Sequence, residues 1–414
     1  MKFEYGCIGE KLKHSFSKEI HNSLASYDYG IIEIPKEELD SFANKKEFKA
    51  INVTIPYKEM IIPYLYEIDA RAREIGAVNT VVNRGGKLYG YNTDFYGMSA
   101  LISRLGIDLN GKKVIILGTG GTSKTSLAVA KSLGAREIVR VSRSRRENAV
   151  TYEELYEKHS DADVIINTTP SGMFPNIFDT PVDLSRFSSL SGVVDAVYNP
   201  LRTPLILAAK KRKIAAEGGL YMLVAQAVRA SEIFIDTKYE KNETDKVFDK
   251  IYKNKENIVL TGMPASGKST VGRLIAEAMG REFIDTDEII ECDEGKKIPD
   301  IFKEYGEKYF RDAETRAIKK AASLCGKVIA TGGGAILREE NVDALRENGK
   351  IYFIDRPLAD LIPTSDRPLS SDRVAIEKRY NERYAIYTRT ADVRIDVDSD
   401  AKGVAAKIME DFQK

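Results

Sequence analysis

The sequence predicts an α/β protein of two or three domains, in which short buried strands alternate with helices. Its length of 414 residues exceeds that of one ordinary domain. Two apolar runs, Lys113–Leu117 and Ile258–Thr261, each lead into a glycine-rich turn that is followed by a helical pattern. Because strand, turn and helix in this order are typical of ligand sites in open α/β sheets, we expect two such sites.

The composition is that of an ordinary globular protein, with 43% hydrophobic and 30% charged residues. The net charge of +1 gives no electrostatic reason to expect nucleic acid or an anionic membrane as a partner. The cysteines, Cys7, Cys292 and Cys325, lack the spacing of a metal or redox motif and indicate a reducing compartment. The first residues lack the apolar core of a signal peptide, and no apolar run is long enough to span a bilayer. We therefore expect a cytoplasmic protein, whose oligomeric state the sequence does not predict.

Hydroxyl groups follow the first predicted strand, Phe3–Ile8. Ser15 and Ser17 stand one residue apart before a helical pattern, so Ser17 is a candidate N-cap. Taken alone, the pair is explained by helix capping. The next strand, Phe48–Ile55, ends at Pro56, which suits the first turn of a helix.

Four polar side chains lie at or just beyond strand ends and turns in this first segment: Thr54, Lys58, Asn79 and Asp94. They belong to the runs Asn-Val-Thr-Ile-Pro-Tyr-Lys, Gly-Ala-Val-Asn-Thr and Asn-Thr-Asp. Turn chemistry explains any one of these runs alone. Together with the serines they supply hydroxyls, amides, one amine and one carboxylate. That combination suits a small polyhydroxylated acid as the ligand.

A dinucleotide-binding pattern follows the strand Lys113–Leu117, and a helical pattern leaves it. Its turn is rich in small residues: Gly118, Gly120, Gly121, Thr122 and Ser123. The next strand, Glu137–Val141, ends in a basic cluster that contains Ser142, Arg143 and Arg145. An NAD site usually has an acidic residue at this offset, whereas arginine accommodates the 2′-phosphate of NADP. A solvated basic loop is the alternative, and the offset favours NADP.

Three further polar runs, 167–173, 195–200 and 218–226, follow in the same half. The first two come directly after apolar runs, so we expect them to face the cofactor, with Tyr198 in the second. The third contains Gln226 in an otherwise apolar helical pattern. A lone glutamine there is more often a satisfied core amide than a ligand.

On these runs, residues 1 to about 240 resemble shikimate dehydrogenase over their full length. The resemblance implies a two-lobed enzyme with a Rossmann-type NADP domain, whose helix carrying Gln226 returns to the substrate half. It implies that Lys58 and Asp94 form the catalytic pair. The implied substrate-binding residues are Ser15, Ser17, Thr54, Asn79, Asp94 and Gln226. The implied NADP-binding residues are Gly118, Gly120, Gly121, Thr122, Ser142, Arg143, Arg145, Tyr198 and Gly219. Lys18 departs from the family, which usually has proline there.

A phosphate-binding loop begins beyond the middle of the chain, where residues 262–269 fit G-x-x-x-x-G-K-[ST]. The glycines let backbone N–H groups point at phosphate oxygens, and the N-terminus of the following helix favours negative charge. Lys268 can reach the β- and γ-phosphates, and Ser269 can hold Mg²⁺. A chance match is the alternative, and the strand–loop–helix setting argues against it.

Charged side chains and glycines follow the loop. Asp285 and Asp287 end the next short strand, where one carboxylate could serve Mg²⁺ and the other a substrate hydroxyl, although helix capping explains them too. Arg311 and Glu314 lie three apart, a spacing that is commonly a surface pair. The glycines at 332–334 follow a buried strand and allow a backbone to approach a ligand.

From about residue 257 to the end, the chain resembles shikimate kinase, which implies a P-loop domain with a parallel sheet flanked by helices. Arg367, in a segment rich in Pro, Ser and Asp, is the candidate lid residue. The implied ATP-binding residues are Gly262, Ala265, Ser266, Gly267, Lys268, Ser269, Thr270 and Arg367. The implied shikimate-binding residues are Asp287, Arg311, Gly332, Gly333, Gly334 and Arg383. Lys268 and Asp287 are the expected catalytic residues, and Ser269 and Asp285 the expected Mg²⁺ ligands.

Together the two resemblances imply one bifunctional enzyme of aromatic biosynthesis. It would reduce 3-dehydroshikimate to shikimate with NADPH, and then phosphorylate shikimate with ATP to give shikimate 3-phosphate. An NAD-dependent quinate/shikimate dehydrogenase is one alternative, and the arginine cluster argues against it. A non-catalytic half that senses shikimate is another. The proton-transfer and phosphate-binding residues present in both halves argue against that second alternative.

The segment that joins the halves is charged, and Val247, Phe248, Ile251 and Tyr252 form one narrow apolar stripe in it. We therefore expect a solvent-exposed connector. We also expect halves that stay active after a cut near Lys253. The expected domains are a substrate domain at 1–95, an NADP domain at 96–218, a returning helix at 219–240, a linker at 241–256 and a kinase domain at 257–414.

Overall fold

The chain forms two compact units in the computed structural model, which describes residues 3–12, 15–25, 27–361 and 373–414. The first unit comprises Met1–Asn199 and Ala208–Ile251, and the second comprises Pro200–Leu207 and Tyr252–Lys414. Sheets flanked by helices build both units, so the predicted α/β class is confirmed.

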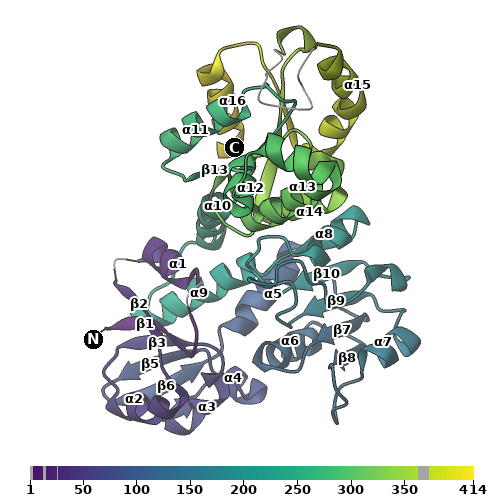
Figure 1. Cartoon of the computed structure of the whole chain (residues 1–414). Helices are drawn as coiled ribbons and strands as arrows, with labels where there is room; N and C mark the ends of the chain where they lie inside the picture. Colours follow the sequence, from purple (N-terminus) through teal and green to yellow (C-terminus); the bar gives the residue numbers. More distant parts are fainter. Residues whose placement is uncertain (1–2, 13–14, 26, 362–372) are drawn as a thin grey trace. The chain divides into compact units, whose positions relative to one another are not determined.

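The first unit contains a six-stranded mixed sheet in the order β2-β1-β3-β5-β6-β4 (Figure 1). Strands β1, β2 and β3 run parallel, while β5 is antiparallel to both β3 and β6. Apolar side chains from these strands, including Ile8, Ile51 and Val81, form a buried core. The strands are β1 (Tyr5–Gly9), β2 (Tyr29–Glu33), β3 (Ala50–Val53), β4 (Glu67–Ile68), β5 (Thr80–Arg84) and β6 (Lys87–Tyr91).

Helix α9 (Leu220–Ile235) packs against α1, α5 and β5, and most of its residues are buried. A helix that is apolar on nearly all sides is stable only inside a core. The accompanying helices are α1 (Ser17–Leu24), α2 (Leu39–Lys45), α3 (Tyr57–Met60), α4 (Ala70–Ile75) and α5 (Asp94–Arg104). Across the described ranges, α9 included, no helix has both the length and the apolar character that a membrane span requires.

The second sheet of this unit is parallel throughout, in the order β11-β10-β9-β7-β8. All five residues of β7 are buried, as expected for a central strand covered on both faces. The strands are β7 (Lys113–Leu117), β8 (Glu137–Val141), β9 (Val164–Asn167), β10 (Gly192–Asp195) and β11 (Ala215–Glu217). The helices between them are α6 (Gly121–Ser132), α7 (Tyr152–Lys158) and α8 (Pro204–Lys211).

The second unit is built on a parallel sheet in the order β13-β14-β12-β15-β16. Side chains alternate along β12: Ile258 and Leu260 join the core under α11 and α16, whereas Val259 joins the core under α13, α14 and α15. The strands are β12 (Asn257–Thr261), β13 (Phe283–Asp285), β14 (Val328–Ala330), β15 (Gly349–Asp355) and β16 (Val393–Asp396).

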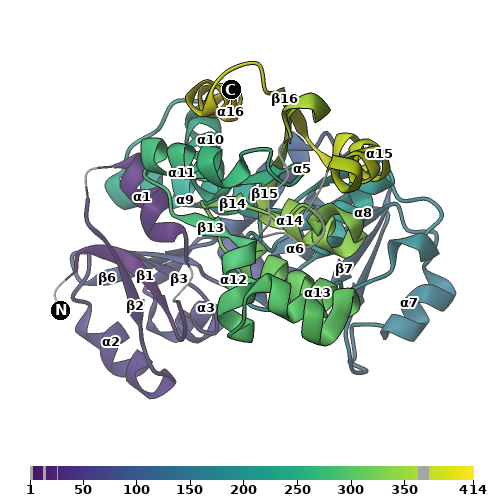
Figure 2. The same ribbon diagram turned by 45° about the horizontal axis from the view of Figure 1, so that its top comes forward.

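Helices α12 and α13 of the second unit lie side by side in both ribbon views (Figures 1 and 2). They follow β13 and carry several of the predicted site residues. The helices of this unit are α11 (Lys268–Met279), α12 (Thr286–Glu294), α13 (Ile298–Ala322), α14 (Glu339–Asn348), α15 (Arg373–Thr390) and α16 (Ala401–Gln413).

The predicted connector is a helix, α10 (Glu243–Lys255), whose apolar stripe is buried. Val247, Phe248 and Ile251 are each at most 6% exposed, and the ring of Phe248 lies edge-on to Tyr221 at 5.3 Å. The expectation of a solvent-exposed connector was therefore wrong. The stripe is narrow, but α9 presents an apolar partner for it, which the sequence of the segment alone does not reveal.

Candidate active sites

A cavity of about 300 Å³ in the first unit brings together side chains from both of its sheets. The strand ends and turns that the sequence pointed to converge here. The predicted residues that line it are Ser17, Thr54, Lys58, Asn79, Asp94, Thr122, Tyr198, Gly219 and Gln226. This convergence creates one site from segments that lie far apart in the chain.

Lys58 and Asp94 form a buried ion pair in this cavity. The Nζ atom of Lys58, on α3, donates to Oδ2 of Asp94, the first residue of α5, over 2.6 Å. The two side chains are only 14% and 9% exposed. A charge-assisted hydrogen bond of this kind fixes the ammonium group in place. The lysine can therefore present a proton to an oxygen of a ligand in the cavity.

An amide and hydroxyl network lies beside the ion pair. The Thr93 N–H donates to Asn79 Oδ1 over 2.7 Å, and Thr93 Oγ1 donates to Gln226 Oε1 over 3.2 Å. The Gln226 Nε2 group in turn donates to the carbonyl of Leu223. Gln226 is therefore both a satisfied buried amide and part of the cavity wall, and Thr93 is an unpredicted member of the network.

The two serines have different positions. Ser17 lines the cavity and is the first residue of α1, whose N-cap is Phe16, so its predicted capping role was wrong. Ser15 Oγ donates to Ser17 Oγ over 3.0 Å and accepts from the Ser17 N–H over 3.2 Å. Ser15 thus holds Ser17 in place.

Burial raises the pKa of nearby Tyr198 to about 12, so its hydroxyl stays protonated at neutral pH.

The glycine-rich turn after β7 allows a ligand to approach its backbone closely. Gly118 has a φ of +108°, and a Cβ there would lie 2.7 Å from Oγ1 of Thr168. A Cβ on Gly120 would meet no atom within 4 Å, which leaves room for a ligand against the backbone. Gly121 begins α6, whose N-terminal N–H groups favour a diphosphate.

The basic loop after β8 is held by a backbone hydrogen bond from Ser142 N–H to the carbonyl of Val150, over 2.9 Å. Ser142 is buried, while Arg143 and Arg145 are exposed on the loop. Their guanidinium groups are thus accessible to the 2′-phosphate of a dinucleotide bound at the turn.

Cys7 lines this cavity and was not predicted from the sequence, whereas Met173 ends the run 167–173 that was expected to face the cofactor. Asn52 belongs to the run that ends at Lys58. Its Oδ1 atom accepts a hydrogen bond from the Tyr29 hydroxyl over 2.6 Å. The ring of Tyr29 in turn stacks on His21 at 3.9 Å. Burial raises the pKa of Cys7 to about 12, so the thiol is not ionised at neutral pH. Nothing in the sequence around Cys7 distinguishes it from an ordinary core residue.

In the phosphate-binding loop of the second unit, Gly262 and Gly267 have φ of +151° and +94°, conformations that favour glycine. Lys268 begins α11 and is 6% exposed, and its Nζ donates to the carbonyls of Gly262 and Met263 over 3.0 and 2.9 Å. Ser266 is buried within the loop. A cavity of about 290 Å³ beside it is lined by Ala265, Gly267, Lys268, Ser269, Thr270, Asp285, Asp287 and Thr331.

A hydroxyl and a carboxylate meet at the edge of this cavity. Ser269 Oγ donates to Oδ2 of Asp285 over 2.7 Å, while Oδ1 of Asp285 accepts from the Asp287 N–H over 3.0 Å. Asp285 thus caps α12, which was the alternative to a metal-binding role, and it also contacts Ser269. Hard oxygen donors of this kind fit Mg²⁺, which also keeps water and phosphate ligands.

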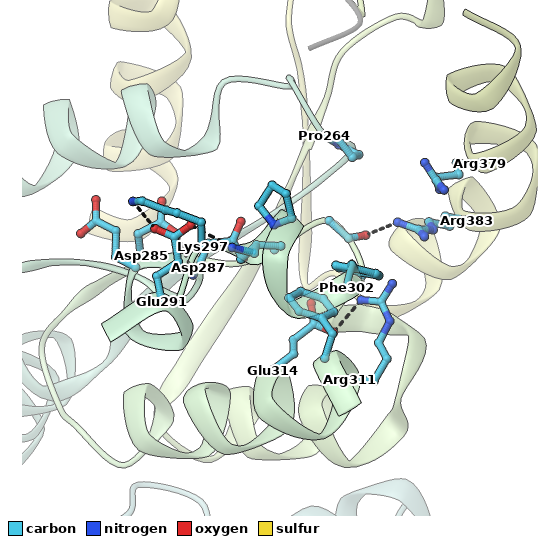
Figure 3. A pocket seen from close by; sticks show the side chains of 17 residues that line it. Pro264, Asp285, Asp287, Glu291, Lys297, Phe302, Arg311, Glu314, Arg379 and Arg383 are labelled. Carbon is cyan, nitrogen blue, oxygen red and sulfur yellow. Dashed lines mark hydrogen bonds and ion pairs between the residues drawn. The ribbon is translucent and has the colours of Figure 1, made fainter. Parts of the chain in front are cut away.

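A second, adjoining cavity of about 530 Å³ shares Asp285 and Asp287 with the first. Figure 3 shows the two carboxylates on one side and Arg311, Arg379 and Arg383 on the other. The arrangement suits a ligand with a carboxylate at one end and hydroxyls at the other. The two aspartates therefore lie where a ligand in one cavity would meet a ligand in the other.

The Arg311–Glu314 pair is buried, and its interpretation as a surface pair was wrong. Arg311 donates to Glu314 over 2.8 Å, with side chains 9% and 1% exposed. Burial raises the pKa of Glu314, and the adjacent guanidinium opposes that rise. A Cβ on Gly334 would overlap Nη1 of Arg311, so a larger residue there would displace the guanidinium from its present position. Arg383 donates to the carbonyl of Gly333 over 2.9 Å.

Lys297, Phe302 and Arg379 also line this cavity but were not predicted. Arg379 precedes Arg383 by one helical turn on α15, a spacing that could have indicated it. Lys297 pairs with Glu291 over 2.7 Å at the start of α13. Arg367, the predicted lid residue, lies outside the described residues.

Comparisons with known proteins cover both halves of the chain. Residues 264–413 match the shikimate kinase family, and residues 7–81 match the shikimate dehydrogenase substrate binding domain. A shikimate dehydrogenase (NADP(+)) of Clostridium beijerinckii is 36% identical over 267 residues, which cover 60% of this chain and 98% of that relative.

Two crystal structures match the first half. Shikimate dehydrogenase 1 from Peptoclostridium difficile has a TM-score of 0.56 at 36% identity, over 61% of this chain and 98% of that one. Shikimate 5-dehydrogenase from Thermus thermophilus, in complex with NADP(H) and shikimate, has a TM-score of 0.54 at 25% identity, over 60% of this chain and 99% of that one.

Proposed function

We infer that the two sites of this chain, which belongs to the shikimate dehydrogenase family and carries a shikimate kinase domain, act on successive compounds of one pathway. The chain is a bifunctional enzyme with NADP-dependent shikimate dehydrogenase and shikimate kinase activities. In the pathway's direction, reduction of 3-dehydroshikimate gives shikimate, which is then the kinase substrate. We assign the dehydrogenase to residues 1–240, the join to 241–256 and the kinase to 257–414.

In the dehydrogenase site, Lys58 is the group that gives a proton to the ketone oxygen. The turn after β7 would hold NADPH, which would supply the hydride for the ketone carbon. The buried Asp94 carboxylate holds the ammonium group of the lysine in place at 2.6 Å. Asn79, Gln226, Thr54 and the serine pair supply hydrogen bonds to the ring hydroxyls and carboxylate. The Lys58–Asp94 pair in a cavity shared by both sheets is the observation that carries this assignment.

In the kinase site, Asp287 orients and deprotonates the shikimate hydroxyl, while Lys268 stabilises the transferring phosphoryl group. ATP and Mg²⁺ bound at the loop supply the phosphoryl group and offset its charge. Ser269 and Asp285 would hold the metal ion, and Arg311 and Arg383 would bind the shikimate carboxylate. The position of Asp285 and Asp287 in the walls of both cavities supports these roles.

A coupled assay tests the two activities together. The purified chain, given 3-dehydroshikimate, NADPH and ATP with Mg²⁺, should form NADP⁺ and ADP with shikimate 3-phosphate as the final product. Omission of ATP should leave shikimate as the product. If shikimate 3-phosphate fails to form when shikimate itself is supplied with ATP, the assignment of the kinase site is wrong.

Cofactor choice gives a separate prediction. Replacing Arg143 and Arg145 together with glutamine should raise the KM for NADPH much more than the KM for NADH, because only NADPH carries the 2′-phosphate. Steady-state kinetics with both cofactors measure the difference. Lys49→Gln, an exposed change in the other lobe, is the matched control. Equal effects on the two cofactors would contradict the assignment.

A further inference from the structure

Each unit includes a short segment that the sequence led us to expect outside it, in the NADP domain or in the linker. Residues 200–207, which follow β10 in the dehydrogenase sequence and include the first four residues of α8, belong to the second unit. Residues 243–251, at the start of α10, belong to the first unit. One arginine stands at the centre of the contacts in each case.

Arg202 anchors the first of these segments inside the second unit. Its guanidinium donates to the carbonyl of Arg346 over 2.7 Å, to the carbonyl of Gly349 over 2.9 Å and to the carboxylate of Glu256 over 2.9 Å. It also donates to the hydroxyl of Tyr252 over 2.5 Å. The side chains of Arg202 and Glu256 are only 17% and 10% exposed. A guanidinium group that donates four hydrogen bonds in this way holds its segment specifically.

The backbone of this segment is held as well. The N–H of Arg202 donates to the carbonyl of Glu347 over 2.9 Å, and the N–H of Leu201 donates to Oδ1 of Asn348 over 2.9 Å. Those acceptors form the end of α14, directly before β15, the strand beside β12. The segment therefore binds the start of β15, beside the start of β12, at the end of the sheet opposite to the phosphate-binding loop.

Arg104 holds the second segment inside the first unit. Its guanidinium lies 4.5 Å from the ring centre of Tyr221 and 4.7 Å from that of Phe248. It also pairs with Asp245 over 3.1 Å and with Glu217 over 3.4 Å. A cation that contacts two aromatic rings, with two carboxylates beside it, ties α10 to α5, α9 and β11.

We propose that this exchange of segments joins the two enzymes: residues 200–207 complete the kinase fold, and residues 243–251 complete the dehydrogenase fold. A kinase without the segment would keep Glu256 buried without its ion pair to Arg202, and removal of one partner of a buried pair is strongly destabilising. The carbonyls of Arg346, Glu347 and Gly349 would also lose their donors. We therefore now expect that a cut near Lys253 does not free two intact enzymes, contrary to the expectation from the sequence.

Cleavage after folding tests the exchange. A protease site inserted in the exposed turn between α9 and α10, after Lys241, lets the folded full chain be cut there. The two pieces should elute together in size-exclusion chromatography, with both activities kept. Separation of the pieces with both activities intact would overturn the proposal. In the Arg104→Ala and Arg202→Ala double variant, the cut pieces should separate, and continued co-elution would equally overturn the role given to the arginines.

Heat inactivation of the uncut chain tests Arg202 by itself. Arg202→Ala should lower the midpoint for loss of kinase activity by roughly 5 to 15 °C, as expected for a broken buried ion pair in a unit of this size. Arg202→Lys keeps the positive charge without the forked guanidinium, so its midpoint should lie between those of the unmodified chain and Arg202→Ala. Arg316→Ala removes an exposed ion pair with Glu294 and should leave the midpoint unchanged. An Arg202→Ala midpoint equal to that of Arg316→Ala contradicts the proposal.

Discussion

Replacing Lys58 with alanine is expected to abolish ketone reduction while kinase activity stays near that of the unmodified chain. Lys58 is the proton donor in the dehydrogenase cavity, and loss of one acid–base group typically costs about 10²–10⁴-fold in rate. The kinase residues lie in the other unit and do not include Lys58. The measurement is kcat for reduction of 3-dehydroshikimate, together with kinase turnover on the same preparation.

The control for this change is Lys49→Ala, which removes an exposed lysine paired with Glu4 in the same lobe. It should leave both activities unchanged. Binding of NADPH, followed by its fluorescence, should also survive in Lys58→Ala, because the cofactor turn belongs to the other sheet. A Lys58→Ala enzyme with normal kcat would show that another group supplies the proton.

The ligand turns were the most predictable part of the molecule. Gly118 and Gly262 occupy backbone conformations that glycine adopts easily, and each follows a strand whose buried run is visible in the sequence. These features are local, so a few neighbouring residues determine them. The Lys58–Asp94 pair was also expected, although only the resemblance to a family linked two residues on different runs.

Contacts made by packing were not predictable from local pattern. Arg202 reaches Glu256 and Gly349 across 54 and 147 positions of the chain, and nothing in the run around it distinguishes it from an exposed arginine. The pairing of Arg311 with Glu314 was predicted from their spacing, but the burial of the pair depends on how α13 packs. The apolar stripe on α10 could be predicted from the sequence, whereas its contact with Tyr221 could not. Sequence pattern states which face is apolar, and the fold decides what covers it.

Asp287→Asn should lower kinase turnover by about 10²–10⁴-fold while ATP binding is largely kept. The amide cannot accept the hydroxyl proton, whereas its shape and size are nearly the same. The groups that hold the nucleotide, Lys268 and Ser269, are unchanged, and so is Asp285, the expected metal ligand. The dehydrogenase should be unaffected, which gives an internal measure of correct folding.

The positions of the carboxylates make this test discriminating. Asp287 lines both cavities of the kinase, so its loss could in principle affect either ligand. Titration of the variant with ATP and, separately, kcat and KM for shikimate distinguish the two effects. Asp293→Asn, on the same helix but paired with Lys320 at the surface, is the matched control and should behave as the unmodified enzyme. If Asp287→Asn lost ATP affinity but kept its turnover, Asp287 would serve the nucleotide, and Asp285 would become the candidate base.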